Sequence, residues 1–147
     1  MGEKQNILIT GAGSGIGRAS ALRMANNMHV IAADWNEDGA AETVALIEAD
    51  KGSATAIHVD VRKRTSVAAM KTRIDSEIGP VHKALFAAGV FIRGVVGNIP
   101  EKDWDRMIDI HVKGTFLCCQ AVLPDMIDNG KGAIVTMSSD FAVMAVP

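Results

Sequence analysis

The sequence predicts an α/β fold in which a doubly wound parallel sheet lies between two layers of helices. Five short apolar runs recur along the chain, and segments with helical spacing separate them. The runs are near-continuous rather than alternating, as is typical of strands buried on both faces. An alternation of strands and helices produces right-handed crossovers and a parallel sheet. We expect five strands, at Asn6–Thr10, His29–Asp34, Thr55–Asp60, Lys83–Ala88 and Ala133–Ser138.

Four segments between these strands have the spacing of helices. In three of them residues recur every three or four positions, at Ile16, Ala19 and Leu22, at Ala41, Val44 and Glu48, and at Val67, Met70 and Ile74. The longest helix is expected from about Glu101 to Asn129, because Pro100 and Asp103 are typical of a helix start. Its expected buried face holds Trp104, Ile108, His111, Thr115, Cys118 and Val122. Pro124 should kink this helix or end its regular part.

Composition indicates one globular domain over residues 1–147. The chain is 48% apolar and 22% charged with a net charge of −2, so neither a disordered chain nor a nucleic-acid or membrane-surface binder is indicated. The adjacent Cys118 and Cys119 do not have metal-ligand or disulfide spacing. No signal peptide and no apolar run of membrane-spanning length is recognised. We therefore expect a cytoplasmic protein without a metal site.

A glycine-rich loop follows the first expected strand. Gly11, Gly15 and Gly17 enclose Ser14 and Ile16, and the next helix begins here. Glycines permit a tight turn and let backbone N–H groups approach an anion at the positive end of a helix. A surface turn is the alternative, but a strand before the loop, a helix after it and an acid on the next strand favour a nucleotide-binding loop.

Two acids are expected at the same edge of the sheet. Asp34 ends the second strand, where a carboxylate can accept hydrogen bonds from the ribose hydroxyls of an adenosine and would repel a 2′-phosphate. Trp35 and Asn36 follow it, without a neighbouring Arg or Lys, so NAD is favoured over NADP. The alternative is a helix N-cap at Asp34 or Asn36. Asp60 could contact the adenine amino group, and a simple cap or turn acid is an alternative of nearly equal weight.

These residues, taken in order, resemble the short-chain dehydrogenase/reductase family over the whole chain. The motifs are Thr10-Gly11-xxx-Gly15-x-Gly17, Asp34, Asp60-Val61, Ala87-Ala88-Gly89, His111-Val112-Lys113-Gly114 and Ile134–Ser139. The resemblance implies a Rossmann domain that binds NAD and transfers hydride between the nicotinamide and a small alcohol or carbonyl substrate. It also implies a homo-oligomer, either a dimer or a tetramer. The cofactor-binding residues expected from the residues and the resemblance together are Gly11, Ser14, Gly15, Ile16, Gly17, Asp34, Asp60, Val61, Ala88 and Gly89.

The resemblance also implies catalytic roles. In this family a Tyr acts as general acid/base, a Lys lowers its pKa, a Ser binds the substrate oxygen, and an Asn holds a relay water. Ser139 stands at the position of that Ser, with Ser138 as the second choice. His111 stands where the Asn is expected, and an imidazole could serve in the relay because it titrates near neutrality. Ala87 replaces the usual Asn of the Asn-Ala-Gly motif.

No Tyr occurs among the 147 residues, and the sequence reaches Pro147 before the expected Tyr-xxx-Lys motif. We therefore expect a domain that is incomplete at its C-terminus. Three hypotheses follow from this sequence. The chain is the N-terminal part of an NAD-dependent enzyme, a non-catalytic NAD-binding protein, or a half-protein that a second chain completes.

Overall fold

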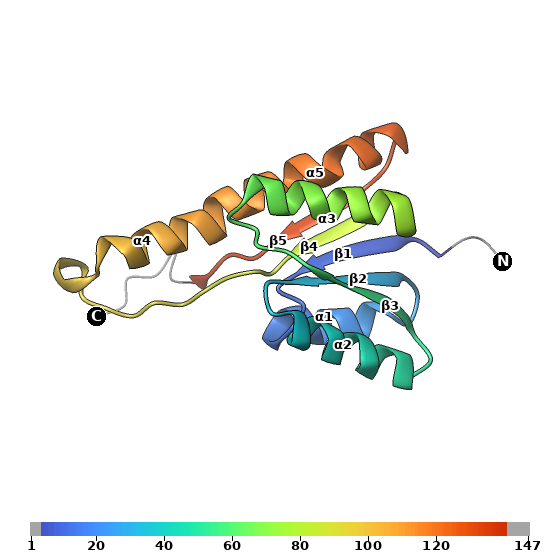
Figure 1. The fold of residues 1–147 in the computed structure, drawn as a ribbon, viewed down its shortest axis with the longest axis horizontal. Helices are drawn as coiled ribbons and strands as arrows, with labels where there is room; N and C mark the ends of the chain where they lie inside the picture. The colour runs from blue at the N-terminus through green and yellow to red at the C-terminus, as the bar shows by residue number, and fades with distance from the viewer. Residues whose placement is uncertain (1–3, 141–147) are drawn as a thin grey trace.

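The computed structural model describes residues 4–140 and contains a five-stranded parallel sheet with the strand order β3-β2-β1-β4-β5 (Figure 1). Each β-α-β connection returns the chain to the same edge of the sheet, so all carboxyl ends of the strands meet there. The predicted doubly wound parallel sheet is confirmed. The strands are β1 (Asn6–Thr10), β2 (His29–Asp34), β3 (Ser53–His58), β4 (Lys83–Phe86) and β5 (Ala133–Thr136).

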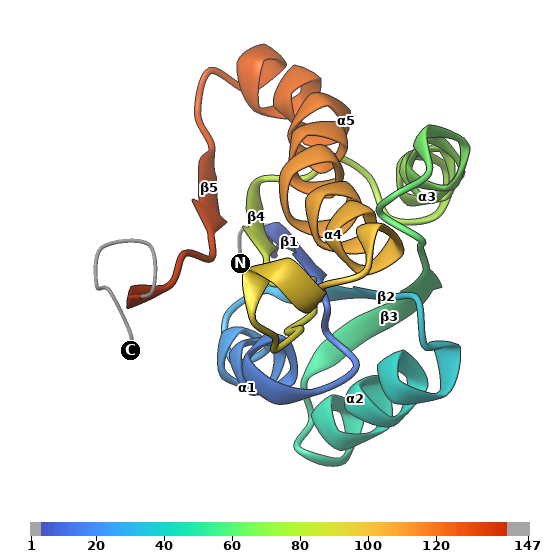
Figure 2. The ribbon, with the colours of Figure 1, turned by 90° about the vertical axis from the view of Figure 1, so that its left-hand side faces the viewer.

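Helices cover both faces of the sheet (Figures 1 and 2). One face carries α1 (Gly15–Met24) and α2 (Glu37–Ala49), and the other carries α3 (Arg64–Glu77) and α5 (Thr115–Asp128). Between β4 and α5 lie a short 3-10 turn η1 (Val96–Asn98), α4 (Glu101–Met107) and a π-helical segment η2 (Ile108–Gly114). Among residues 4–140, no helix is long and apolar enough to cross a membrane.

The core consists of two apolar clusters, one on each face of the sheet. Leu8 and Ile31 point into the cluster beneath α3 and α5, whereas Ile9 and Val30 point into the cluster beneath α1 and α2. Since successive side chains of a strand alternate between faces, a strand covered on both sides must be apolar at every position. All five residues of β1 are buried, which confirms the interpretation of its near-continuous apolar run.

Three strands end earlier than predicted, at the carboxyl edge. β3 spans Ser53–His58 rather than Thr55–Asp60, and Asp60 leaves the ladder because its N–H donates to Ser66 Oγ at 2.9 Å. β4 ends at Phe86 and β5 at Thr136, two residues before their predicted ends. The apolar run of β3 extends past the strand because Val59, which follows it, is buried in the core.

The predicted inner faces of the first two helices are wrong. The buried residues of α1 are Gly17 and Ala21, and Ile16 is 62% exposed. In α2 they are Gly39, Ala40, Thr43 and Ile47, one position away from the predicted set. Small residues face the sheet in both helices because the helix backbones pass close to the strands and the glycine loop. The predicted face of α3, with Val67, Met70 and Ile74, is confirmed.

The long helix is continuous from Glu101 to Asp128 but changes type along its length. A π-helical segment adds residues per turn and rotates the following face. The predicted face is therefore buried at Cys118 and Val122 but exposed at Trp104, Ile108 and His111. Of the two outcomes predicted for Pro124, an end of the regular helix is wrong, because the helix continues to Asp128 with the buried Val122 and Met126 on either side of the proline.

Candidate cofactor cleft

A cleft of about 570 Å³ opens at the carboxyl edge of the sheet. It lies where the chain leaves β1, β2, β3 and β4, the edge at which ligands bind in open α/β sheets. The structure brings all the predicted cofactor residues together there, since the lining includes Gly11, Ser14, Gly15, Ile16, Gly17, Asp34, Asp60, Val61, Ala88 and Gly89. Their binding role stays a prediction.

Close backbone contacts explain two glycines of the loop. Gly11 has a φ of +72°, and a Cβ atom on it would lie 2.7 Å from the Ala88 nitrogen. A Cβ on Gly17 would lie 2.0 Å from the Gly11 carbonyl oxygen. No side chain fits at either position without moving backbone. The loop therefore lies directly against β4 and against the first turn of α1, whose N-terminal amides face the cleft region.

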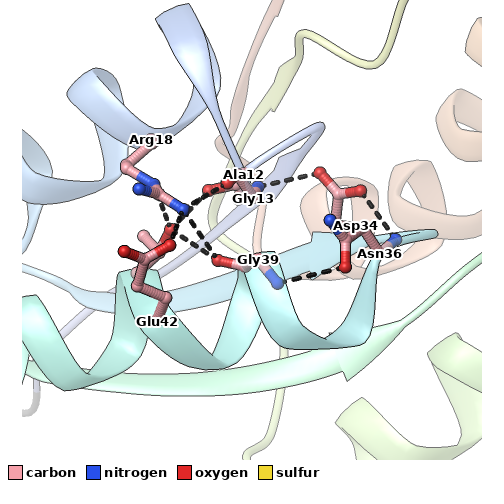
Figure 3. A network of polar contacts seen from close by, with 8 residues as sticks. Ala12, Gly13, Arg18, Asp34, Asn36, Gly39 and Glu42 are labelled. Carbon is pink, nitrogen blue, oxygen red and sulfur yellow. Dashed lines mark hydrogen bonds and ion pairs between the residues drawn. The ribbon is translucent and has the colours of Figure 1, made fainter.

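Asp34 is the centre of a polar network between the loop and α2 (Figure 3). Its Oδ2 accepts a 2.8 Å hydrogen bond from the Gly13 N–H, and its Oδ1 accepts a 2.9 Å bond from the Asn36 N–H. The residue is 7% exposed and lines the cleft. Each carboxylate oxygen can accept a second hydrogen bond, so capacity is left for a diol. Asp34 and Asn36 were both considered as a helix N-cap, and it is Asn36 that caps α2. Its side chain accepts a hydrogen bond from the Gly39 N–H at 3.2 Å.

Gly13 is a site residue that the sequence prediction missed. A Cβ atom on it would lie 2.9 Å from Asp34 Cγ and Oδ2, so the carboxylate reaches the loop only because this position is glycine. Its carbonyl oxygen also lies 3.0 Å from a Cβ that would be built on Gly39, which brings α2 equally close. The signal was present in the sequence as a third glycine between Gly11 and Gly15.

Asp60 is paired with Arg62 in the described chain. The Arg62 Nε and Nη2 atoms donate to the two Asp60 oxygens, each at 2.8 Å, and Lys63 Nζ lies 3.6 Å from Oδ2. These hydrogen bonds lower the pKa of Asp60 to about 2. Arg62 also lines the cleft and was not predicted as a site residue. The positive charge of the Arg62 guanidinium is therefore paired with the Asp60 carboxylate.

Backbone contacts hold the cleft wall that follows β4. Ala87 donates its N–H to the Thr10 carbonyl at 3.1 Å, and the Ala88 N–H lies 3.4 Å from Thr10 Oγ1. The connection to β1 at this point is thus made by backbone despite the absence of an amide side chain at Ala87. Gly89 packs against a ring from the long helix, because a Cβ on it would lie 2.7 Å from His111 Cε1.

His111 does not occupy the buried position that was predicted. Its side chain is exposed on η2 and is not among the residues that line the cleft. Its Nε2 lies 2.8 Å from the Val90 carbonyl oxygen and 3.2 Å from the Val90 nitrogen. The imidazole therefore attaches the long helix to the segment after β4. The π-helical geometry, which the sequence pattern did not reveal, turns this position outward.

The predicted Ser pair lies apart from the cleft lining. Ser138 and Ser139 follow β5 and are exposed, and the Ser139 hydroxyl donates to Asp140 Oδ1 at 3.2 Å. Within the described part of the chain, no group of three or more His, Cys, Asp or Glu residues could hold a metal ion. Burial raises the pKa of the Cys118 thiol to about 12.

Strand order, the glycine loop and the cleft define a Rossmann-like α/β protein. A sequence model of the short chain dehydrogenase family matches residues 5–147, and the chain belongs to this family.

Known proteins agree with this assignment. The chain is 36% identical over 140 residues to a D-threitol dehydrogenase from Mycolicibacterium smegmatis, covering 95% of this chain and 54% of that protein. It is 33% identical over 134 residues to a meso-2,3-butanediol dehydrogenase from Serratia marcescens, covering 90% and 52%. The structure of a hydroxysteroid dehydrogenase from Escherichia coli superposes with a TM-score of 0.86 at 31% identity, covering 92% and 57%. The chain spans about half the length of the relatives it matches.

Proposed function

We propose that the chain forms the cofactor-binding part of an NAD-dependent oxidoreductase. The proposed reaction of the whole protein is hydride transfer between NAD and a secondary alcohol or ketone of the polyol, sugar or 3-oxoacyl class. The observation that carries the proposal is the buried Asp34 carboxylate, which is fixed beside the glycine loop by the Gly13 and Asn36 amides and faces the cleft. Two relatives named for polyol substrates, D-threitol and butanediol, support the alcohol class.

The residues of the cleft fit a dinucleotide. The glycine loop offers backbone amides at the start of α1 for a diphosphate, and its close contacts with β4 exclude side chains from that space. Asp34 would accept the adenosine ribose hydroxyls, and its charge disfavours a 2′-phosphate. Arg62, a cation on the same cleft, is held by two hydrogen bonds to Asp60 and so is not directed to Asp34. These features favour NAD over NADP.

Bound NAD would supply the hydride acceptor, and the protein would supply position and proton transfer. We propose that Ser139 binds the substrate oxygen and that His111 takes part in a proton relay near Val90. Neither lines the cleft in the described structure, so both roles require further parts of the site. Since the 147 residues contain no Tyr, the acid/base phenol implied by the family is assigned to the full-length protein.

The exposed apolar side chains of the long helix support a homo-oligomer, either a dimer or a tetramer. Trp104, Val112, Phe116 and Ile127 are each more than half exposed, and three of them are spaced by multiples of four residues along α4, η2 and α5. β5 is the last strand of the described sheet, with its outer edge not paired to a described strand. Analytical ultracentrifugation of the full-length protein would test this proposal, and a monomer at micromolar concentration would contradict it.

The activity is tested with full-length protein. Titration with NADH and NADPH should show tighter binding of NADH, and a panel of polyols, sugars, secondary alcohols and 3-oxoacyl thioesters should reveal a substrate through NADH formation or consumption. Intact mass spectrometry separates the alternatives, because a mass near 15.5 kDa would favour the non-catalytic protein or the half-protein. A failure to bind either nicotinamide cofactor would refute the proposal.

A further inference from the structure

Arg18 lies between the glycine loop and α2 without lining the cleft (Figure 3). Its Nη2 donates to the Gly13 carbonyl oxygen at 2.5 Å and to Glu42 Oε2 at 2.6 Å, and its Nε donates to Thr43 Oγ1 at 3.0 Å. The side chain is 25% exposed, whereas that of Glu42 is 62% exposed. A planar guanidinium can make these contacts together because its donors are fixed in a fork.

The peptide group between Ala12 and Gly13 is hydrogen-bonded at both its carbonyl oxygen and its N–H. Thr43 is completely buried and accepts from Arg18. Its single hydroxyl hydrogen is left for a carbonyl, with the Ala12 oxygen at 2.8 Å and the Gly39 oxygen of its own helix at 3.0 Å. The N–H of that same peptide group, which belongs to Gly13, donates to Asp34. The orientation of the Ala12–Gly13 peptide therefore sets where the Asp34 carboxylate is held.

Arg18 fixes the next peptide group, between Gly13 and Ser14, by donating to its carbonyl oxygen. The described backbone contains no cis peptide bond, so the N–H of Ser14 points away from the Gly13 carbonyl and hence away from Arg18. Ser14 lines the cleft. A rotation of this peptide would turn the Gly13 carbonyl oxygen toward an incoming anion, and the Arg18 contact opposes that rotation.

We propose that Arg18 is a positioning residue for the cofactor. It holds the Gly13 carbonyl on the α2 side, so that the Ser14 amide of the same peptide group is directed to the cofactor diphosphate. Through Thr43 it also supports the preceding peptide group, whose Gly13 amide meets Asp34. This inference rests on the proposed function, since it assigns a support to the same site. Arg18 acts through the backbone, and its charge is directed to Glu42 rather than to the ligand.

The test compares Arg18→Gln, Arg18→Lys and the control Arg23→Gln in the full-length protein. Arg23 lies in the last turn of the same helix and is exposed, so the control removes the same charge away from the loop. NADH affinity is measured by quenching of tryptophan fluorescence, since Trp35 lines the cleft. Amide hydrogen exchange of Gly13, whose N–H donates to Asp34, is measured by NMR without cofactor.

Arg18→Gln should weaken NADH binding at least about tenfold, because hydrogen bonds to a charged donor are lost, and should accelerate exchange of the Gly13 amide, which is bound to Asp34. Arg18→Lys keeps the charge but not the fork, so it should show a smaller version of both changes. Arg23→Gln should show neither. Because the exchange is measured on folded, ligand-free protein, a variant that fails to fold is recognised, and Arg18→Lys then decides.

Two results would overturn the inference. Weaker NADH binding with unchanged amide exchange would mean that the Arg18 charge acts on the ligand directly. Faster exchange with unchanged affinity would mean that the contact serves only stability. If the wild-type protein binds neither NADH nor NADPH, the proposed function fails instead. In that case unchanged amide exchange in Arg18→Gln would separately reject the role of Arg18 in holding the glycine loop.

Discussion

Replacement of Asp34 by Asn tests two roles of the carboxylate. The first is to hold the Gly13 and Asn36 amides, and the second, which we propose, is to bind the ribose hydroxyls of the cofactor. Both carboxylate oxygens accept a backbone N–H, at 2.8 Å from Gly13 and 2.9 Å from Asn36. An Asn side chain has one oxygen, so its NH2 group would face one of these donors. The more buried Gly13 amide should keep the oxygen, which leaves the Asn36 amide opposite an NH2 group.

An unsatisfied buried donor costs about 1–3 kcal/mol. Because Asn36 is exposed and its hydrogen bond is only partly buried, we expect the free energy of unfolding of Asp34→Asn to fall by about 1 kcal/mol, the low end of this range. The second effect concerns the cofactor, because an amide offers the ribose hydroxyls a weaker acceptor than a carboxylate. Charged hydrogen bonds contribute about 1.5–3 kcal/mol, so NADH affinity should fall roughly 10- to 100-fold.

Urea unfolding and NADH titration of the full-length protein measure the two effects separately. The matched control is Glu48→Gln, which removes a carboxylate from the exposed side of α2, and it should change neither quantity by more than about 0.5 kcal/mol. Unchanged stability and unchanged affinity in Asp34→Asn would refute the assignment. Lower stability with unchanged affinity would leave Asp34 as a structural clamp alone.

Three further outcomes are expected. His111→Asn in the full-length protein should retain turnover, since an amide can also donate to the Val90 carbonyl, and should shift the pH profile of turnover. An unchanged pH profile would mean that His111 serves only in packing. The lowered pKa of Asp60, about 2, makes its pairing stabilising above the unfolded value of about 3.9 and lost as pH falls toward 2. The loss of unfolding free energy in Arg62→Gln should therefore shrink between about pH 6 and pH 2, and an equal loss at both would argue against the pairing. Burial raises the pKa of both cysteines, so thiol reagents at pH 8 should label native Cys119 slowly and Cys118 only after unfolding; fast labelling of Cys118 would disprove its burial.

The position of the cleft was predictable because its signals are local. A glycine loop directly after an apolar strand and acids at the ends of the next strands all fall at one edge of a parallel sheet, whatever the details of packing. The lining of the cleft confirms that Gly11, Asp34 and Asp60 meet there. The partner of Asp60 could not be predicted, because the direction of the Arg62 side chain depends on how the chain turns after β3.

The π-helical segment could not be predicted from the sequence pattern, for a different reason. Counting by three and four assumes the α-helical turn, and the π-helical segment Ile108–Gly114 breaks that assumption in the middle of the longest helix. The count therefore placed His111 on the same face as the buried Cys118, although the structure exposes it. Packing of Val122 and Met126 likewise outweighs the local preference of Pro124 to end a helix.

The errors in α1 and α2 follow from the construction of the site itself. Periodicity weighs large apolar side chains, but the sheet-facing positions beside the loop are small. Gly17 and Gly39 are buried because a Cβ on either would meet loop backbone, at 2.0 Å from the Gly11 oxygen and 3.0 Å from the Gly13 oxygen respectively. The large side chain of Ile16 is thereby left at the cleft, 62% exposed. Hydrophobic periodicity therefore fails in these two helices because their backbones approach the glycine loop too closely for large side chains at the facing positions.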